Sequence, residues 1–153
     1  MTRSFRTAGH SLIALAALAL IVLPAREVRS QGVKPSALEG AWKLVEQKNG
    51  DAQEYRKYPE GLEFINLVTG GRFAWTVVSK GRVGAAAGGT YRVDGDKYTE
   101  TIEYVSGQGV PETFVGSTFD FTCKIEGDIL HKVGTIQING QDYKIDEKWE
   151  RCK

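Results

Sequence analysis

Short turn sequences recur along this chain between runs of strand-forming residues, and they constrain its fold more than any other feature. Thr69-Gly70-Gly71, Asp94-Gly95-Asp96 and Glu126-Gly127-Asp128 each separate two runs rich in β-branched and aromatic residues. A fourth turn, Asn139-Gly140, has the composition that is the strongest short-range indication of a hairpin. Because consecutive hairpins place sequential strands side by side, the sequence predicts an antiparallel meander.

Eight strands are expected, and no part of this region has a convincing helical pattern. A twisted sheet of this size leaves two exposed edges unless its first strand pairs with its last. The predicted fold class is therefore all-β, an eight-stranded antiparallel up-and-down β-barrel over residues 38–153. Four glycines and three alanines between Lys80 and Gly89 predict a mobile loop. The predicted strands are Trp42–Gln47, Leu62–Val68, Phe73–Val78, Thr90–Val93, Lys97–Val105, Val115–Ile125, Ile129–Ile138 and Tyr143–Arg151.

The N-terminus has the composition of a secretory signal peptide. Two arginines precede an apolar run from Ser11 to Leu23. We predict that residues 1–30 are removed by cleavage after Ser30, with Ala25 as the alternative position, and that residues 31–37 form a short linker. The apolar run is shorter than the ~20 residues of a membrane-spanning helix, so an uncleaved anchor is the second interpretation. The expected location is secreted or periplasmic.

The charge balance argues against nucleic acid as a partner. The whole chain has a net charge of +1, and the predicted signal peptide holds four arginines and one glutamate, which leaves about −2 on the mature chain. Nucleic-acid binding normally needs a basic stripe, and the lysines here alternate with acidic residues. His131, the one histidine after the signal peptide, gives no set of metal ligands with two cysteines. No motif supplies an activated nucleophile, so we expect neither an enzyme nor a cofactor, and we expect His131 on a strand surface.

Gly40 and Trp42 open the first predicted strand, and Arg151 lies at the end of the last. This arrangement resembles the lipocalins and the wider calycin superfamily, and the chain is similar to small secreted bacterial lipocalin-like proteins. In that superfamily the tryptophan closes the barrel base and a basic residue packs over its indole. The resemblance implies a structural role for Gly40, Trp42 and Arg151 and a ligand pocket inside the barrel. The similar segments are Leu38-Glu39-Gly40-Ala41-Trp42, Arg72-Phe73-Ala74-Trp75, Gly88-Gly89-Thr90-Tyr91, Tyr98-Thr99-Glu100-Thr101-Ile102-Glu103-Tyr104 and Glu147-Lys148-Trp149-Glu150-Arg151.

Alternation along the predicted strands indicates which side chains face the barrel lumen. The inward positions carry aromatic and apolar residues together with two carboxylates, Glu100 and Glu147. A buried carboxylate needs a partner, and Arg92 or Arg72 could supply one. One hypothesis is that these groups orient the polar end of a ligand; the alternatives are an internal ion pair, or a bulge that turns the glutamates outward. The candidate ligand-binding residues are Phe73, Trp75, Arg92, Tyr98, Glu100, Tyr104, Phe119, Phe121, Glu147 and Trp149.

Cys123 and Cys152 could pair, because an oxidising compartment favours disulfides. Strand alternation, however, turns Cys123 inward and Cys152 outward, on strands about 9–10 Å apart. A disulfide needs Cα atoms within about 7 Å, although the C-terminal tail could fold back to meet that requirement. A disulfide and two free thiols are both open interpretations.

These features favour a secreted or periplasmic protein that binds a small hydrophobic ligand in the barrel lumen. The alternative is a protein-interaction or inhibitor module with a filled barrel, acting through loops at residues 79–89 and 106–114. The first interpretation places function inside the barrel, and the second places it at the rim.

Overall fold

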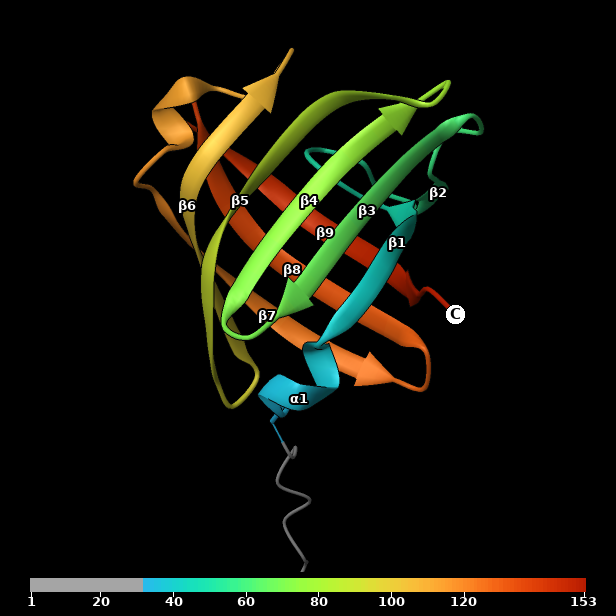
Figure 1. Cartoon of the computed structure of the whole chain (residues 1–153), viewed down its shortest axis with the longest axis vertical. Coiled ribbons are helices and arrows are strands. Elements are labelled where there is room, and N and C mark those ends of the chain that lie inside the picture. Colours follow the sequence, from blue (N-terminus) through green and yellow to red (C-terminus); the bar gives the residue numbers. More distant parts are fainter. Residues whose placement is uncertain (1–31) are drawn as a thin grey trace, which may run out of the picture.

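The computed structural model describes residues 32–153, which fold almost entirely as β-strands (Figure 1). The predicted signal peptide, residues 1–30, lies outside the described residues. The elements in chain order are α1 (Pro35–Leu38), β1 (Gly40–Gln47), β2 (Arg56–Lys57), β3 (Leu62–Thr69), β4 (Arg72–Ser79), β5 (Arg82–Asp94), β6 (Lys97–Gly107), the 3-10 helix η1 (Glu112–Phe114), β7 (Thr118–Glu126), β8 (Ile129–Ile138) and β9 (Gln141–Arg151).

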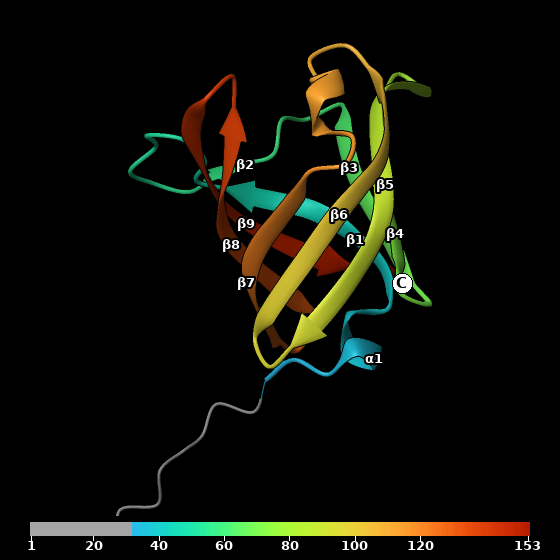
Figure 2. The same ribbon diagram turned by 90° about the vertical axis from the view of Figure 1, so that its left-hand side faces the viewer.

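The strands β1 and β3 to β9 form a closed antiparallel barrel, which confirms the predicted fold class. From β3 to β9 each strand pairs with the next along the chain, and β1 pairs with both β3 and β9. The pairing of β1 with β9 therefore closes the ring (Figures 1 and 2). The short strand β2 is an addition to this ring, since it pairs with the end of β1 at Glu46 and Gln47.

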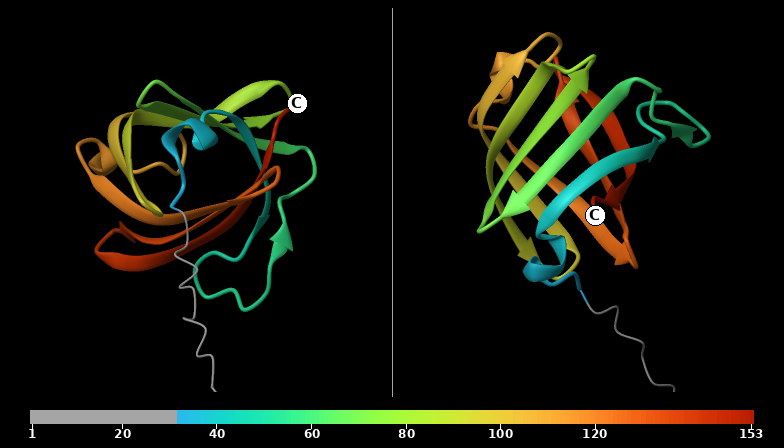
Figure 3. Two further views of the ribbon diagram at one scale, coloured as in Figure 1. Left: turned by 90° about the horizontal axis from the view of Figure 1, so that it is seen from below. Right: turned by 45° about the vertical axis from the view of Figure 1, so that its right-hand side comes forward.

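The helical turn α1 lies at one end of the barrel, the base, as the view from below shows (Figure 3). Trp42 closes this end from within. Trp42 is fully buried and lies opposite Arg151 in the pairing of β1 with β9. The guanidinium carbon of Arg151 is 4.1 Å from the indole centroid, and Trp42 Nε1 donates to the carbonyl of Leu38 at 2.7 Å. Arg151 Nη1 and Nη2 donate to the carbonyls of Glu39 (2.8 Å) and Ala37 (2.6 Å). One cation thus covers the ring, as the resemblance implies, and also satisfies carbonyls at the end of α1.

Gly40 is required by the same contact. Its φ of +129° is a conformation that residues with a side chain rarely adopt. A Cβ at this position would also lie 2.9 Å from Arg151 Nη1. The Gly-x-Trp sequence therefore serves the closure of the base through both of its defined residues.

The mobile loop predicted at residues 80–89 is wrong, because residues 82–89 form the first part of the long strand β5 and only Lys80 and Gly81 lie in the turn before it. Its small residues allow neighbouring strands to come close together. A Cβ on Gly89 would lie 1.9 Å from the carbonyl oxygen of Thr101 on β6. Ala87 is buried opposite Trp75 of β4, where a small side chain leaves room for the indole. The scarcity of side chains reflects close packing here and not mobility.

Two other segments differ from the predicted secondary structure. Residues 31–37, predicted as a linker, include most of the single helical turn α1. Residues 106–114 are shorter as a loop than predicted, because β6 continues to Gly107 and η1 occupies Glu112–Phe114. Among the described residues, no helix has the length and apolar character needed to cross a membrane.

Replacing Arg151 with alanine should lower the free energy of unfolding by roughly 2–4 kcal/mol, because a cation–π contact and two hydrogen bonds from a charged donor are lost. Urea unfolding followed by tryptophan fluorescence measures this change. Arg82→Ala, at an exposed position of β5, is the matched control and should change stability by less than about 0.5 kcal/mol. Equal effects of the two substitutions would contradict a closing role for Arg151.

Candidate functional site

Most of the predicted lumen residues lie inside the barrel. They come from β4, β6, β7 and β9, and their alternation within those strands turns them toward a common centre. Trp75 and Phe119 are half-buried and pack against the core. The fully buried members are Phe73, Tyr98, Glu100, Phe121, Glu147 and Trp149.

A buried ion pair occupies the centre of this lumen. Nζ of Lys132 is 2.7 Å from Oε1 of Glu100, and the two side chains are 9% and 4% exposed. The ammonium also lies 3.9 Å from the ring centroid of Phe121. Burial alone would lower the pKa of Lys132, but the negative charges of Glu100 and Glu147 outweigh it and raise the pKa. Lys132 is therefore a fixed positive charge between two glutamates.

Glu147 is the less well neutralised of the two buried carboxylates. Its Oε1 accepts from Asn49 Nδ2 at 3.2 Å, and its Oε2 accepts from Trp149 Nε1 at 3.1 Å. Both donors are neutral. Burial raises the pKa of Glu147, while the attraction of Lys132 and these hydrogen bonds opposes that rise. The carboxyl group thus lies in an environment that favours a proton or another positive partner.

Two further polar atoms in the lumen have no hydrogen-bond partner within residues 32–153. They are the amide oxygen of Asn66 and the hydroxyl of Tyr98. Asn66 lies between Trp42 and Trp75 in the strand register, on the inner face of β3, and is 4% exposed. Tyr98 is 2% exposed, and burial raises the pKa of its hydroxyl. Buried polar groups are normally paired, so the amide oxygen of Asn66 marks unused bonding capacity in the lumen, whereas the Tyr98 hydroxyl has the Glu100 carboxylate nearby.

The end of the barrel opposite the base, the mouth, is lined by apolar side chains that remain partly exposed. The ring of Phe64 is in contact with three others, since its centroid is 5.2 Å from Trp75, 4.9 Å from Trp149 and 6.0 Å from Tyr58. The other half-buried lining residues that pack against the core are Val105, Phe119, Ile136 and Ile145. The mouth is therefore an apolar and aromatic surface directly above the buried charged cluster.

Two predicted lumen residues lie on the outer face instead. Tyr104 is 46% exposed, because a bulge between Ile102 and Tyr104 shifts the alternation of β6 and places Tyr104 over Gly88. Arg92 is exposed and pairs with Thr99, whose hydroxyl donates to a carboxylate on the outside. The predictions for these two residues are wrong.

The predicted cation for the glutamates is also wrong. Arg72 forms an exposed ion pair with Glu103, and Lys132 takes the role expected of an arginine. Lys132 could have been found from the sequence, because Leu130, Lys132 and Ile136 share one face of a predicted strand that is otherwise apolar. The same argument could have identified Asn66, because alternation places it at an inward position of β3 between larger apolar residues.

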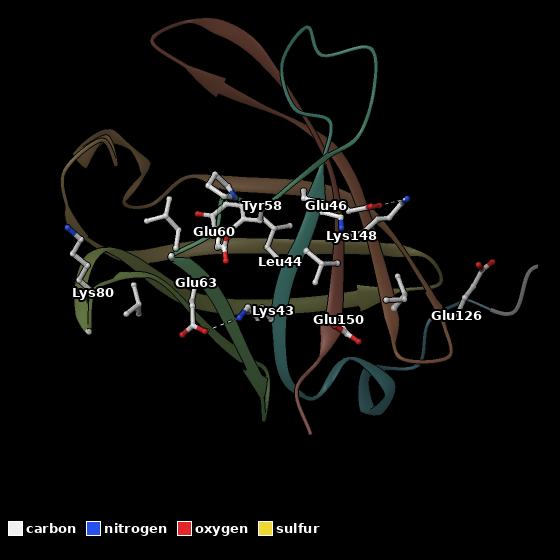
Figure 4. A pocket seen from close by; sticks show the side chains of 18 residues that line it. Lys43, Leu44, Glu46, Tyr58, Glu60, Glu63, Lys80, Glu126, Lys148 and Glu150 are labelled. Atoms are coloured by element: carbon white, nitrogen blue, oxygen red, sulfur yellow. Dashed lines mark hydrogen bonds and ion pairs between the residues drawn. The ribbon is translucent and has the colours of Figure 1, made fainter.

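A groove on the outer surface, the outer groove, has a volume of about 980 Å³ (Figure 4). It forms where the pairing of β1 with β3 ends at Lys43 and Ile65, so that the two strands diverge. Two ion pairs border it, Lys43 with Glu63 (2.9 Å) and Lys148 with Glu46 (2.8 Å). These four side chains point outward. The core residue Leu44 and the ring of Tyr58, which packs against Phe64, also line the groove, so it adjoins the barrel core where the two strands diverge.

His131 lies on the outer face, as predicted, and belongs to a second polar cluster. Its Nε2 is 2.8 Å from Asp146 Oδ1 and 2.9 Å from the hydroxyl of Tyr55, which also donates to Asp146. Lys148 Nζ lies 3.9 Å from the centroid of the Tyr55 ring, and Lys48 pairs with Asp146 at 3.1 Å. Burial and the adjacent carboxylate raise the pKa of Tyr55 to about 12. The cluster fastens the segment between β1 and β3 to the outer face of β8 and β9.

Cys123 and Cys152 are both free thiols. Cys123 faces the lumen and is 2% exposed, whereas Cys152 is exposed at the end of β9. Burial raises the pKa of the Cys123 thiol to about 12, which keeps it protonated and unreactive. The structure therefore agrees with the geometric argument against a disulfide between Cys123 and Cys152.

No known protein-family model matches this chain, and no curated protein or solved structure matches it either. The chain is a closed eight-stranded antiparallel β-barrel with an apolar mouth and a charged cluster beneath it. Among residues 32–153, no group of three or more His, Cys, Asp and Glu side chains is placed to hold a metal ion.

Replacing Lys132 with methionine should lower the free energy of unfolding by roughly 3–5 kcal/mol, because Glu100 is then buried without its cation. Adding Glu100→Gln should recover part of that loss, since Glu147, which accepts hydrogen bonds from Asn49 and Trp149, is then the one carboxylate beside residue 132 that keeps its charge. Denaturant unfolding of the single and double variants at neutral pH measures both effects. Lys124→Met, which removes an exposed ion pair with Glu126, is the control and should cost less than about 1 kcal/mol. A Lys132→Met variant as stable as this control would contradict a buried pair.

A thiol reagent such as Ellman's should modify Cys152 rapidly in the folded protein and Cys123 only after unfolding, because thiolate character and exposure control reactivity. The expected result is a single fast-reacting thiol, which Cys152→Ser removes. Two thiols that react only after chemical reduction would show that the cysteines form a disulfide instead.

Proposed function

We propose that this protein is a lipocalin-like binding protein that takes a small, largely hydrophobic ligand into the mouth of its barrel. The observation that carries the proposal is the arrangement of partly buried rings, Phe64 and Trp75 among them, above a buried charged cluster. Binding sites for small molecules typically combine such an apolar lining with a few fixed polar groups. The lipocalin-like assignment draws further support from the Trp42–Arg151 contact at the base.

The physical basis of the proposal is the burial of apolar surface. Each Å² of apolar surface removed from water contributes roughly 25 cal/mol, and aromatic rings contribute large areas. A hydrophobic ligand that covers the exposed parts of Val105, Phe119 and Ile145 would gain this stabilisation with little rearrangement, because rigid strands present these side chains. The buried charges would then set the orientation of its polar end.

We propose that the site acts in binding and not in catalysis, and that the protein is secreted or periplasmic. The location rests on the predicted signal peptide at residues 1–30. The binding role rests on the charged groups of the lumen, which are held by one another or by neutral donors such as Asn49. Such fixed groups suit recognition of a polar end.

The outer groove supports a second candidate function, the binding of a protein partner on the outer face. Its volume of about 980 Å³ and its alternating lysines and glutamates would suit a polar partner surface. The loops predicted at residues 79–89 and 106–114 are less suited to binding a protein partner, because residues 82–89 belong to β5.

Three tryptophan substitutions separate the two sites. Val105→Trp fills the mouth, Val78→Trp fills the outer groove, and Leu67→Trp adds the same ring at a position of β3 that is 51% exposed. We expect Val105→Trp to weaken binding of the neutral fluorophore N-phenyl-1-naphthylamine at least tenfold. The other two variants should bind it within twofold of the unchanged protein. Fluorescence titration measures all three.

The outcomes are distinct. Loss of binding in Val78→Trp alone would move the site to the outer groove. No saturable binding by the unchanged protein, or equal binding by all variants, would contradict the proposed function. Thermal unfolding of each variant shows whether a change in binding reflects a loss of folded protein.

A further inference from the structure

The lumen contains more hydrogen-bond acceptors and negative charges than its single buried cation satisfies. Glu100 and Glu147 face one ammonium, that of Lys132, and the nearest contact of that ammonium is already Glu100 at 2.7 Å. The amide oxygen of Asn66, which can only accept, has no partner within residues 32–153, and neither has the Tyr98 hydroxyl. Both of these side chains are at least nine-tenths buried and belong to inward positions of the barrel.

These groups lie directly beneath the apolar mouth. Phe119, which lines the mouth, is opposite Glu100 in the pairing of β6 with β7. Ile145, which also lines it, is two residues from Glu147 on the same face of β9, a separation of about 7 Å along a strand. A ligand whose apolar body covers the mouth can therefore extend a short polar group to the carboxylates.

The charge of the cluster decides which polar group fits. A ligand carboxylate would be a third negative charge beside Glu100 and Glu147, and it would compete with Glu100 for Lys132. A protonated amine would instead give Glu147 the charged partner that Asn49 and Trp149 do not provide. Its remaining N–H groups could reach acceptors such as Asn66 Oδ1.

Resting on the function proposed above, we propose that the ligand of the barrel is a hydrophobic amine, an apolar body with one protonated nitrogen that pairs with Glu147. The protonated nitrogen neutralises the excess carboxylate of the cluster. The apolar body stays in the mouth against the aromatic rings around Phe64. The elevated pKa of Glu147 agrees with this, because a carboxyl group that tends to keep a proton is one that lacks a cation.

The test compares three ligands with the same ten-carbon chain, decylamine, decanol and decanoate, as competitors of N-phenyl-1-naphthylamine. Titrations at pH 7.5 and 150 mM NaCl keep the amine protonated and screen the surface charges beyond about 8 Å. We expect decylamine to displace the fluorophore at a concentration at least tenfold below that of decanoate, with decanol between them.

Glu147→Gln tests the assigned partner. It keeps the shape of the side chain and its hydrogen-bond acceptor, and removes the charge. We expect decylamine to bind this variant about tenfold more weakly and decanol to bind it within twofold of the unchanged protein. Glu103→Gln, at an exposed outer position of β6 that does not line the outer groove, is the matched control and should leave all three affinities unchanged.

The failure of this inference and the failure of the proposed function give different results. Decanoate that binds as tightly as decylamine, or an amine preference that survives Glu147→Gln, would overturn the inference while ligand binding itself stands. A similar loss in Glu103→Gln would also overturn it, because the preference would then come from general surface charge. If the fluorophore and all three ligands fail to bind, the proposed function fails and the inference fails with it.

Discussion

The packing of Arg151 against Trp42 is the contact on which the rest of the structure depends. Every other strand pair in the ring joins ring strands that follow one another along the chain, linked by a turn or, between β1 and β3, by the segment that contains β2. The pairing of β1 with β9 joins the two ends, so nothing local favours it. A buried indole covered by a cation, with α1 fastened to the same guanidinium, supplies a specific reason for the ends to meet.

Closure of the ring also creates the charged lumen. Once β9 lies beside β1, its alternation turns Glu147 and Trp149 inward and turns Asp146 and Lys148 outward. The inward pair completes the cluster around Lys132, and the outward pair meets Tyr55. The strand β9 therefore carries polar groups of both the lumen and the outer face. A shift of its register by one residue would exchange its inward and outward side chains.

The fold was predictable because its determinants are local, whereas the site depended on relations between strands. Turn composition and alternation gave the hairpins, and a Gly-x-Trp with a distant arginine gave the closure. Tyr104 was misplaced because alternation assumes a regular strand, and the bulge after Ile102 is not visible in residue types. The scarcity of large side chains at residues 80–89 predicts a loop, because few side chains usually mean little packing. In the structure the backbone of neighbouring strands is too close for larger side chains. The partner of Glu100 could not be identified from one strand, since it depends on which side chains meet across the lumen.

The segment between β1 and β3 connects the two faces of the barrel, and its attachments lie on both sides of the wall. Asn49 donates to Glu147 inside and accepts from the backbone of Asp146, while Tyr55 is bound to Asp146 outside. Between these attachments and β3, Tyr58 places its ring against Phe64 at the mouth, and its backbone N–H donates to the carbonyl of Val45. The backbone of the segment is therefore fixed on both sides of the barrel wall. The same attachments keep Asn49 on Glu147, so the polar end of the lumen is held in place beneath the apolar mouth.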